Sequence, residues 1–229
     1  MQPPHTDERD ADIPCRLRMP RLLPGRDMKD VYIIGAQSTG KTTLVNALAK
    51  DLTGDAIPQR PKVIHEVART VQIEKGFSRE DITTSPVRAL QLQKHILEAQ
   101  YSAQMATCDS VWCILDRSGL DPIVYTKCYV SSEASADLLA SRIWLELESR
   151  MQAGIVVLCE AGCQWLTDDG VRLMPTNLEE WLNVDTAFRD LLEARDISYA
   201  MVPKEITDLE KRVEFVLGLI GLSRTKMLV

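Results

Sequence analysis

The chain has 229 residues, a net charge of −6 and 45% hydrophobic residues. This length suits one α/β domain with a sizeable core, and without a basic excess the composition gives no sign of nucleic-acid binding. No apolar run reaches the length of a membrane span, and the N-terminus has no apolar signal core, so we expect a cytoplasmic protein without a transmembrane segment.

Residues 1–29 are rich in proline and in charges of both signs. No hydrophobic period runs through them, so this segment has little to bury. Its arginines could dock on the domain or on an acidic partner, but charge runs of this kind are usually solvated. We therefore expect a flexible N-terminal extension, followed by one P-loop kinase-like domain over residues 30–229.

From residue 30 onward, apolar strands alternate with amphipathic helices. The expected strands are 31–35, 62–68, 110–116, 154–161 and 197–202. The expected helices are 41–52, 86–106, about 135–152, 185–195 and a last helix that carries Val213, Val216, Leu217 and Ile220. Because each strand is apolar throughout, the pattern predicts an α/β fold with a five-stranded parallel sheet and helices on both faces.

Two of these helices carry capping signals at their start. Ser85 precedes Pro86, and this order is typical of an N-cap followed by the first helical residue. Thr207 and Glu210 have the spacing of a capping box, which predicts that Thr207 caps the last helix.

The first functional motif lies between the first strand and the first helix. Residues 35–42 read GAQSTGKT and fit the pattern G-x-x-x-x-G-K-[ST]. The glycines let backbone N–H groups converge on a phosphate, and the helix N-terminus adds positive charge. Lys41 supplies a point charge to the β- and γ-phosphates, and Thr42 offers a hydroxyl to Mg²⁺. The expected nucleotide-binding residues are Gly35, Gln37, Ser38, Thr39, Gly40, Lys41, Thr42 and Thr43, and the expected cofactors are Mg²⁺ and ATP, with GTP as an alternative.

The third strand ends in Asp116, where a carboxylate can face the Mg²⁺ of a nucleotide. Arg117 follows, in place of the glutamate that polarises water in many motor ATPases, and the chain has no Asn-Lys-x-Asp guanine motif. The sequence Asp-Arg-Ser resembles an element of nucleoside and nucleotide kinases in which the aspartate and arginine lie beside the acceptor. The alternative is a surface turn with an Asp–Arg pair.

Glu66 ends the second apolar strand on the side where the P-loop opens, because parallel strands deliver their carboxyl ends to one crevice. Its carboxylate could take a proton from an acceptor hydroxyl, and Arg69, one turn later, could hold an anion. The alternative is a surface ion pair of little energetic weight. Among the amides of the next helix, Gln91 or Gln93 could read a base edge, but a solvated helix face is favoured.

Four stretches together resemble one family of P-loop domains: GAQSTGKTTL, HEVART, LDRSGLDPIVY and WLTDDGVR. They are similar to the domain shared by bacterial nicotinamide riboside kinase and animal GTP- and lipid-binding trafficking proteins, over roughly residues 30–220. The resemblance implies a kinase-group P-loop NTPase with a lid. It places Glu66, Arg69 and Asp116 in the acceptor pocket, and it assigns three residues to the lid: Asp168, Asp169 and Arg172. Asp116-Arg117-Ser118 departs from the riboside kinase pattern, so the identity of the acceptor stays open.

The segment 162–180 is polar and turn-rich, as a movable cover over a phosphoryl-transfer site would be. Arg172 would then stabilise charge on the transferred group, whereas the alternative is a plain surface loop. By analogy with the fold alone, the sequence VPKEI after the fifth strand is a candidate wall of the adenine pocket.

Two remaining groups of residues have plain interpretations. Cys159 and Cys163 could form a metal pair, but no second pair accompanies them, so reduced thiols are favoured. The four tryptophans are expected to pack in the core or the lid: Trp112, Trp144, Trp165 and Trp181.

We therefore expect an ATP-dependent small-molecule kinase that moves a γ-phosphate to a small hydroxylated or phosphorylated acceptor. The expected catalytic residues are Lys41, Glu66, Asp116 and Arg172, the acceptor-binding residues are Glu66, Arg69 and Arg117, and the metal ligands are Thr42 and Asp116. Two other functions stay open. One is a regulatory nucleotide-binding protein with a lipid or protein partner, and the other is a ligase-like enzyme that activates a carboxylate through a phosphate.

Overall fold

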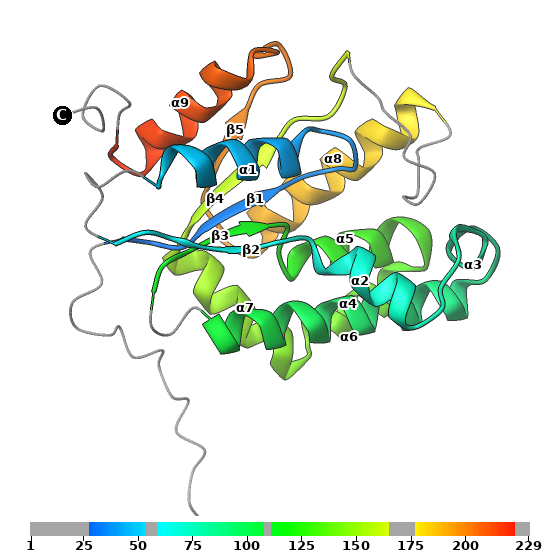
Figure 1. Ribbon diagram of the computed structural model, residues 1–229. Coiled ribbons are helices and arrows are strands. Elements are labelled where there is room, and N and C mark those ends of the chain that lie inside the picture. The colour runs from blue at the N-terminus through cyan, green and yellow to red at the C-terminus, as the bar shows by residue number, and fades with distance from the viewer. Residues whose placement is uncertain (1–27, 54–58, 108–110, 165–176, 223–229) are drawn as a thin grey trace, which may run out of the picture.

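The computed structural model describes residues 28–53, 59–107, 111–164 and 177–222 (Figure 1). The expected N-terminal extension therefore lies outside the described residues, apart from its last two positions. In the part of the chain that the structure describes, no helix is both long enough and apolar enough to cross a membrane.

Five strands, all parallel, form one sheet in the order β2-β3-β1-β4-β5. They are β1 (Val31–Ile34), β2 (Lys62–Ile64), β3 (Cys113–Asp116), β4 (Ile155–Cys159) and β5 (Tyr199–Val202). Every residue of β1 and β3 is buried, because helices cover both faces of the sheet. The predicted α/β fold, a P-loop NTPase with a five-stranded parallel sheet, is confirmed.

Helices lie on both sides of this sheet (Figure 1). In chain order they are α1 (Lys41–Asp51), α2 (Val67–Glu74), α3 (Arg79–Thr84), α4 (Pro86–Thr107), α5 (Leu120–Tyr129), α6 (Ser132–Leu139), α7 (Arg142–Ala153), α8 (Leu178–Ala194) and α9 (Leu209–Leu219). α1 and α9 cover one face, and α4, α5, α7 and α8 lie on the other.

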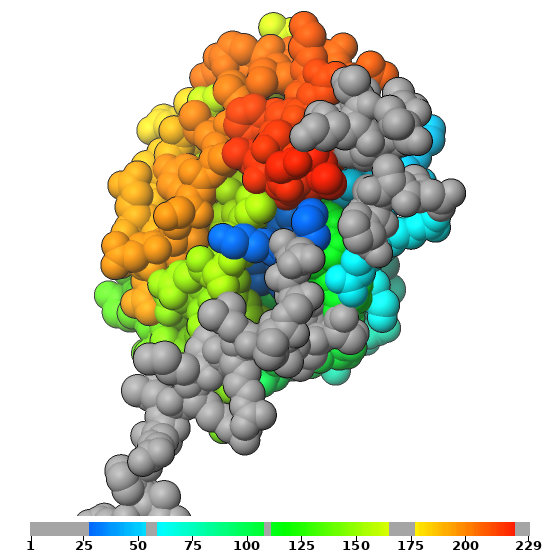
Figure 2. All heavy atoms as spheres, turned by 90° about the vertical axis from the view of Figure 1, so that its left-hand side faces the viewer, coloured from blue at the N-terminus to red at the C-terminus, as the bar shows by residue number. Residues whose placement is uncertain are grey.

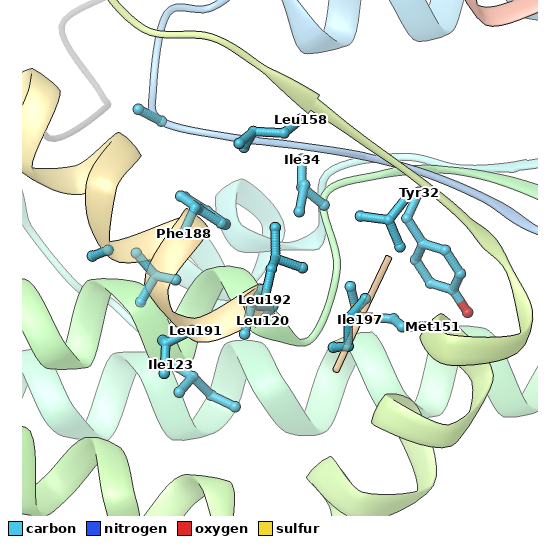
Figure 3. Packing of buried hydrophobic residues seen from close by; sticks show 14 of the residues in the cluster. Tyr32, Ile34, Leu120, Ile123, Met151, Leu158, Phe188, Leu191, Leu192 and Ile197 are labelled. Carbon is cyan, nitrogen blue, oxygen red and sulfur yellow. The ribbon is translucent and has the colours of Figure 1, made fainter. Parts of the chain in front are cut away.

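Alternate residues of β1 serve two separate cores, because successive side chains of a strand point to opposite faces. Val31 and Ile33 pack with apolar residues of α1 and α9. Tyr32 and Ile34 pack on the other face, where Phe188 and Leu192 of α8 fill the space between the sheet and α5 (Figure 3). The first strand is therefore common to both cores.

Two expectations about the segment after β2 and about the middle helices were wrong. The strand expected over 62–68 ends at Ile64, and Val67 already begins α2, in which Val71 is buried one turn later. The helix expected at about 135–152 is two helices, because α6 ends with Ala140 as its C-cap and Ser141 caps α7 by accepting from the N–H of Trp144 at 3.2 Å. α5 was not expected.

The helix starts gave one confirmation and two corrections. The Ser85 hydroxyl accepts from the N–H of Arg88 at 3.3 Å in front of α4, as its sequence predicts. The last helix is capped by Asp208, which accepts from the N–H of Lys211 at 3.0 Å, so the expected cap at Thr207 was one residue early. α8 begins at Leu178 rather than 185, because Asn177 supplies its cap.

The parallel order brings the carboxyl ends of all five strands to one edge of the sheet, on the right in Figure 1. Figure 2 is turned toward the opposite edge, where orange and red residues of the C-terminal third lie beside blue residues near the start of the described chain. β1 lies between β3 and β4. The chain forms β2 and β3 on one side of β1 and later β4 and β5 on its other side, so the loop after β1 lies where the strand order reverses. This is where ligands bind in open α/β sheets.

Candidate active site

The P-loop runs from the end of β1 into α1, and its backbone needs glycine. Gly35 has φ 133°, and a Cβ there would lie 2.6 Å from the carbonyl oxygen of Cys159 on β4. Gly40 has φ 80°, while Ser38 adopts φ 59° although it has a side chain. Alternation of left- and right-handed residues turns successive N–H groups toward one concave side, where an anion can bind.

Lys41 is buried under this loop. Its ammonium donates to the carbonyl oxygen of Ala36 and to the Thr39 hydroxyl (3.3 Å). Burial, together with the neighbouring Arg117, lowers the pKa of Lys41 to about 8. The lysine thus lies at the phosphate site but bonds to its own loop.

A hollow opens at the P-loop, and Thr42 and Thr43 line it at the start of α1. Its lining consists of Ser38, Gly40, Lys41, Thr42, Thr43 and Arg117. Ser38, Gly40 and Lys41 supply polar backbone and charge, and the two threonines supply hydroxyls. Five of the eight expected nucleotide-binding residues therefore line this hollow, and a sixth, Gln37, lines the adjoining pocket. The other two, Gly35 and Thr39, shape the loop from inside.

Asp116 ends β3 beside this loop, in register with Ile33 of β1. Its side chain is fully buried, and neither carboxylate oxygen has a hydrogen-bond partner among the described residues. Lys41 and Arg117 interact with this carboxylate electrostatically, but a buried carboxylate without hydrogen bonds is still costly, so this position fits a group that a bound cation completes. A carboxylate and a hydroxyl beside phosphates are a donor set that suits Mg²⁺, which takes only one or two protein ligands in such sites. The predicted metal ligands Asp116 and Thr42 fit that ion.

Arg117 is the centre of a buried cluster of charges. Its backbone adopts φ 78°, an uncommon conformation outside glycine, and its Nε donates to Glu66 at 2.8 Å. Its Nη1 lies 3.4 Å from a carboxylate oxygen of Asp121. Burial alone opposes the charge, but the carboxylates of Glu66 and Asp121 hold the pKa of Arg117 well above its ordinary value.

Glu66 lies at the N-terminus of α2 and not at the end of β2, so the prediction that a strand carries it was wrong. It nevertheless lies at the crevice where it was expected. It contacts Arg117 and, at 3.5 Å, Arg69, whose side chain is 42% exposed. The alternative of an isolated surface pair with Arg69 does not describe this glutamate, since its side chain is only 9% exposed.

A pocket adjoins the P-loop hollow, and its volume is about 600 Å³ when the open solvent at its mouth is included. Apolar side chains of four helices form its walls: Ala68, Ile82, Leu92, Ile96 and Pro122. Polar groups converge on it as well: Gln37, Glu66, Arg69, Gln72, Gln93, Arg117, Asp121 and Tyr125. Most of the surface that these residues expose inside the pocket is apolar, which is typical of small-molecule sites.

Gln93 corrects an expectation about α4. The solvated face expected for both amides holds for Gln91, which is exposed, but Gln93 is buried and lines the pocket. A helical period that places Leu92 and Ile96 inward carries Gln93 to the same side, and this could have been read from the sequence.

Asp121 and Tyr125 were missed by sequence reasoning. The Tyr125 hydroxyl donates to the side-chain oxygen of Gln37 at 2.7 Å, and burial raises the pKa of Tyr125 to about 12. Burial also raises the pKa of Asp121, which accepts from the N–H and the hydroxyl of Ser118. Both residues follow Arg117 at four-residue steps, a spacing that would have put them on one face had α5 been expected.

Arg172 of the expected catalytic set lies outside the described residues, as do Asp168, Asp169 and Trp165. Of the segment 162–180 expected to form a cover, the structure describes residues 162–164 and 177–180, the last three of which belong to α8.

The chain is similar to known proteins in its sequence family and in its fold. A family model described as an AAA domain matches residues 30–212. No curated protein sequence matches this chain.

Solved structures share the fold at low identity. Deoxyadenosine kinase from M. mycoides with bound dATP is 15% identical, with a TM-score of 0.62 over 84% of this chain and 99% of the other. The same enzyme with products dCMP and dCDP is 14% identical, with a TM-score of 0.61 over 84% and 98%. NadR in complex with NR is 16% identical, with a TM-score of 0.62 over 86% of this chain and 52% of the other, so this chain spans about half the length of NadR.

Proposed function

Because the chain belongs to the AAA domain family, we propose that it is a P-loop kinase that moves the γ-phosphate of ATP, or of GTP in its place, to a small hydroxylated acceptor. The observation that supports this proposal best is the position of Arg117, which lines both the P-loop hollow and the neighbouring pocket. One side chain therefore separates a phosphate cradle from a pocket suited to a small molecule. A donor and an acceptor bound in these two spaces would meet at Arg117.

On the donor side, the P-loop N–H groups and Lys41 would hold the β- and γ-phosphates. Lys41 would exchange the Ala36 carbonyl for phosphate oxygens as the nucleotide enters. Thr42 and Asp116 would hold Mg²⁺, which when bound neutralises charge on the phosphates.

On the acceptor side, Glu66 would serve as the general base. The acceptor oxygen forms a bond to the γ-phosphorus, the bond from that phosphorus to the bridging oxygen breaks, and the hydroxyl proton passes to Glu66. Arg117 fixes the orientation of that carboxylate by its hydrogen bond and supplies positive charge beside the transferred group. Arg172 remains a predicted second cation for the same group.

The pocket favours an acceptor with a flat apolar body and a polar edge. Ile82, Leu92 and Ile96 can contact the faces of such a body, and the amides of Gln72 and Gln93 can hydrogen-bond its edge. Deoxyadenosine kinase and NadR, the latter solved with NR, are similar in fold, so nucleosides and ribosides are the first acceptors to test. Arg69 at the mouth adds their monophosphates to the panel.

The test is a screen of nucleosides, ribosides, nucleoside monophosphates and small carboxylic acids with ATP and Mg²⁺. It is read by ADP release and by the mass of the product. We expect slow hydrolysis without an acceptor, because no glutamate follows Asp116 to position water, and acceptor-dependent release faster by orders of magnitude, since catalysis of this kind is mostly positioning and electrostatics.

Glu66→Gln should abolish the stimulation while ATP affinity stays nearly unchanged. Glu74→Gln is the matched control, because it makes the same chemical change at an exposed position of the same helix. Acceptor-dependent turnover that survives in Glu66→Gln would remove Glu66 from the mechanism. A broad screen without any stimulation, combined with nucleotide-dependent binding to a lipid or a protein, would overturn the kinase in favour of a regulator, and a carboxylate that forms an acyl phosphate would favour a ligase-like enzyme.

A further inference from the structure

Two buried side chains from the last third of the described chain reach the backbone of the P-loop. Nε1 of Trp181, on α8, donates to the carbonyl oxygen of Gln37 at 2.8 Å. Nη2 of Arg212, on α9, donates to the carbonyl oxygen of Thr39 at 2.9 Å. The two side chains belong to residues that are 3% and 4% exposed. These bonds therefore lie inside the protein, where a hydrogen bond to a fixed donor holds its acceptor firmly.

The bonds determine which way the neighbouring N–H groups point. A trans peptide is planar, and its C=O and N–H point in opposite directions. When Trp181 holds the carbonyl of Gln37, the N–H of Ser38 is turned away from α8. When Arg212 holds the carbonyl of Thr39, the N–H of Gly40 is turned away from α9. A phosphate bound on the side of the loop that faces away from α8 and α9 would meet these two N–H groups.

The loop between the two bonds has reason to need such support. Ser38 lies between the two held carbonyls with φ 59°, a left-handed conformation that a residue with a side chain adopts only at an energetic cost. Such a conformation persists only where its surroundings enforce it.

The two donors are anchored independently. α8 is fixed by Phe188 and Leu192 in the core below the sheet, which Figure 3 shows between the sheet and α5. α9 is fixed by Val213 and Val216 in the core above it, beside α1 (Figure 1). The P-loop is therefore held from both faces of the sheet.

We propose that Trp181 and Arg212 are positioning residues for phosphate binding, which act by fixing the Gln37–Ser38 and Thr39–Gly40 peptides. The inference rests on the phosphate-binding part of the proposed function, and it does not depend on the acceptor. Neither residue needs to touch the nucleotide. Without either bond, the N–H groups of the loop must be ordered by the nucleotide itself, so affinity falls.

The first test uses Trp181→Phe, which removes the donor and keeps most of the ring. Trp144→Phe is the matched control, since Trp144 is fully buried in the same core and its Nε1 has no hydrogen-bond partner among the described residues. Calorimetry with AMP-PNP and Mg²⁺ should show affinity about five- to tenfold weaker for Trp181→Phe, the loss expected for one buried hydrogen bond. For Trp144→Phe, affinity should stay within about twofold of the wild type, although urea unfolding should show that both variants are destabilised.

The second test compares Arg212→Met with Arg212→Lys. Methionine removes the charged donor and keeps an unbranched chain, so AMP-PNP affinity should fall about tenfold or more. Lysine restores one donor and should recover part of that loss, which a role in packing alone would not explain. If Arg212→Met does not fold, the AMP-PNP affinities of Trp181→Phe and Arg212→Lys still test the inference.

Each outcome distinguishes this inference from the proposed function. Equal AMP-PNP affinity in wild type, Trp181→Phe and Arg212→Lys would overturn the inference and leave the kinase proposal standing. A wild-type protein that does not bind AMP-PNP would overturn both. A selective loss of AMP-PNP affinity in the two variants supports the inference even if no acceptor is ever phosphorylated.

Discussion

Lys41 is a buried cation of the site that already has hydrogen-bond partners in its own loop. Its ammonium bonds to the Ala36 carbonyl and the Thr39 hydroxyl, and burial lowers its pKa to about 8. Phosphate oxygens would restore the preference for the charged form, because a nearby negative charge favours it. Binding therefore couples to the protonation state of this one lysine.

From this coupling we predict a pH dependence of nucleotide affinity. Below pH 8 Lys41 is protonated before and after binding, so affinity is level. Above pH 8 the free protein loses the proton, binding must take it up again, and affinity falls by about tenfold per pH unit at most. Calorimetry with ADP and Mg²⁺ from pH 7.5 to 9.5 checks this, and flat affinity across that range would contradict it.

Two variants control the measurement. Lys41→Arg keeps its charge throughout the range, so whatever affinity it retains should not depend on pH in this way. Lys50→Ala removes an exposed lysine from the same helix and should leave the profile unchanged. Because the pKa of Lys41 is lower in the folded than in the unfolded chain, this residue adds stability as pH rises from about 8 to its unfolded value, so lost affinity above pH 8 is not lost folding.

Asp116 gives the second prediction at this scale. Its buried carboxylate oxygens have no hydrogen-bond partner among the residues that the structure describes, which fits a role completed by a cation. Asp116→Asn removes the negative charge at nearly the same volume, so Mg²⁺-dependent turnover should fall by orders of magnitude while metal-free nucleotide affinity changes little. Turnover and calorimetry in EDTA measure the two effects, and an equal fall of both with the fold intact would make Asp116 structural.

The α2–α3 hairpin is the element that closes the proposed acceptor pocket on one side, since it carries Arg69, Gln72 and Ile82. Arg88 holds it from α4. Its guanidinium donates to both carboxylate oxygens of Asp81 (3.2 and 3.3 Å) and to the carbonyl of Gly76 (3.2 Å), and it lies 4.2 Å from the centre of the Phe77 ring. The hydrogen bond from Arg88, followed by the one from the backbone N–H of Ser78, lowers the pKa of Asp81 to about 2.

We therefore predict that Arg88→Ala loosens the acceptor side of the site alone. Amide hydrogen exchange should speed up over residues 76–84, while AMP-PNP affinity stays within about twofold because the P-loop is untouched. Arg142→Ala is the matched control, since it removes an exposed arginine with an (i, i+4) partner on α7. Protection of the hairpin that is equal in both variants would show that other contacts hold it.

Most elements could be predicted from periodicity, and the failures have physical causes. β1, β3 and β4 are apolar because both their faces are buried. β5, at the edge of the sheet, is apolar although most of its residues are only partly buried, and α1 and α4 carry clear helical spacing. β2 was drawn too long because Val63, Ile64, Val67 and Ala68 read as one apolar run, whereas the last two belong to α2. α5 was missed because it is buried almost all round, so no polar face marks its period.

Some residues of the candidate site could likewise be predicted from the sequence, and others could not. The P-loop and Asp116 could be predicted because local sequence fixes them: glycines where φ is positive, and an aspartate where a buried strand ends. Arg117 was expected beside the acceptor, but its bonds to Glu66 and Asp121 join segments that the sequence does not show to be neighbours. Trp181 and Arg212 had no local signal at all, since their partners lie 144 and 173 residues earlier.

At the scale of the whole molecule, β1 joins two cores, and the buried tryptophans report on them separately. Trp112 lies in the core shared with α1 and α9, and Trp144 in the core on the other face. Because both cores need β1, we predict that they unfold together. Fluorine NMR of fluorotryptophan-labelled protein in urea measures this, with each signal assigned by a single Trp→Phe variant, and midpoints that differ between Trp112 and Trp144 would contradict it.

The distances in sequence across the P-loop bear on the order in which the chain can fold. Val31 pairs with Ile155, so the strand that precedes the loop gains one of its two neighbours only after some 120 further residues exist. The donors that hold the loop come later still, at residues 181 and 212. Contacts between such distant residues form slowly, because the entropy of closing a long loop is lost before they form. During synthesis, residues 35–42 therefore leave the ribosome long before they can take their final shape, and we expect tight nucleotide binding to mark a molecule whose folding is complete.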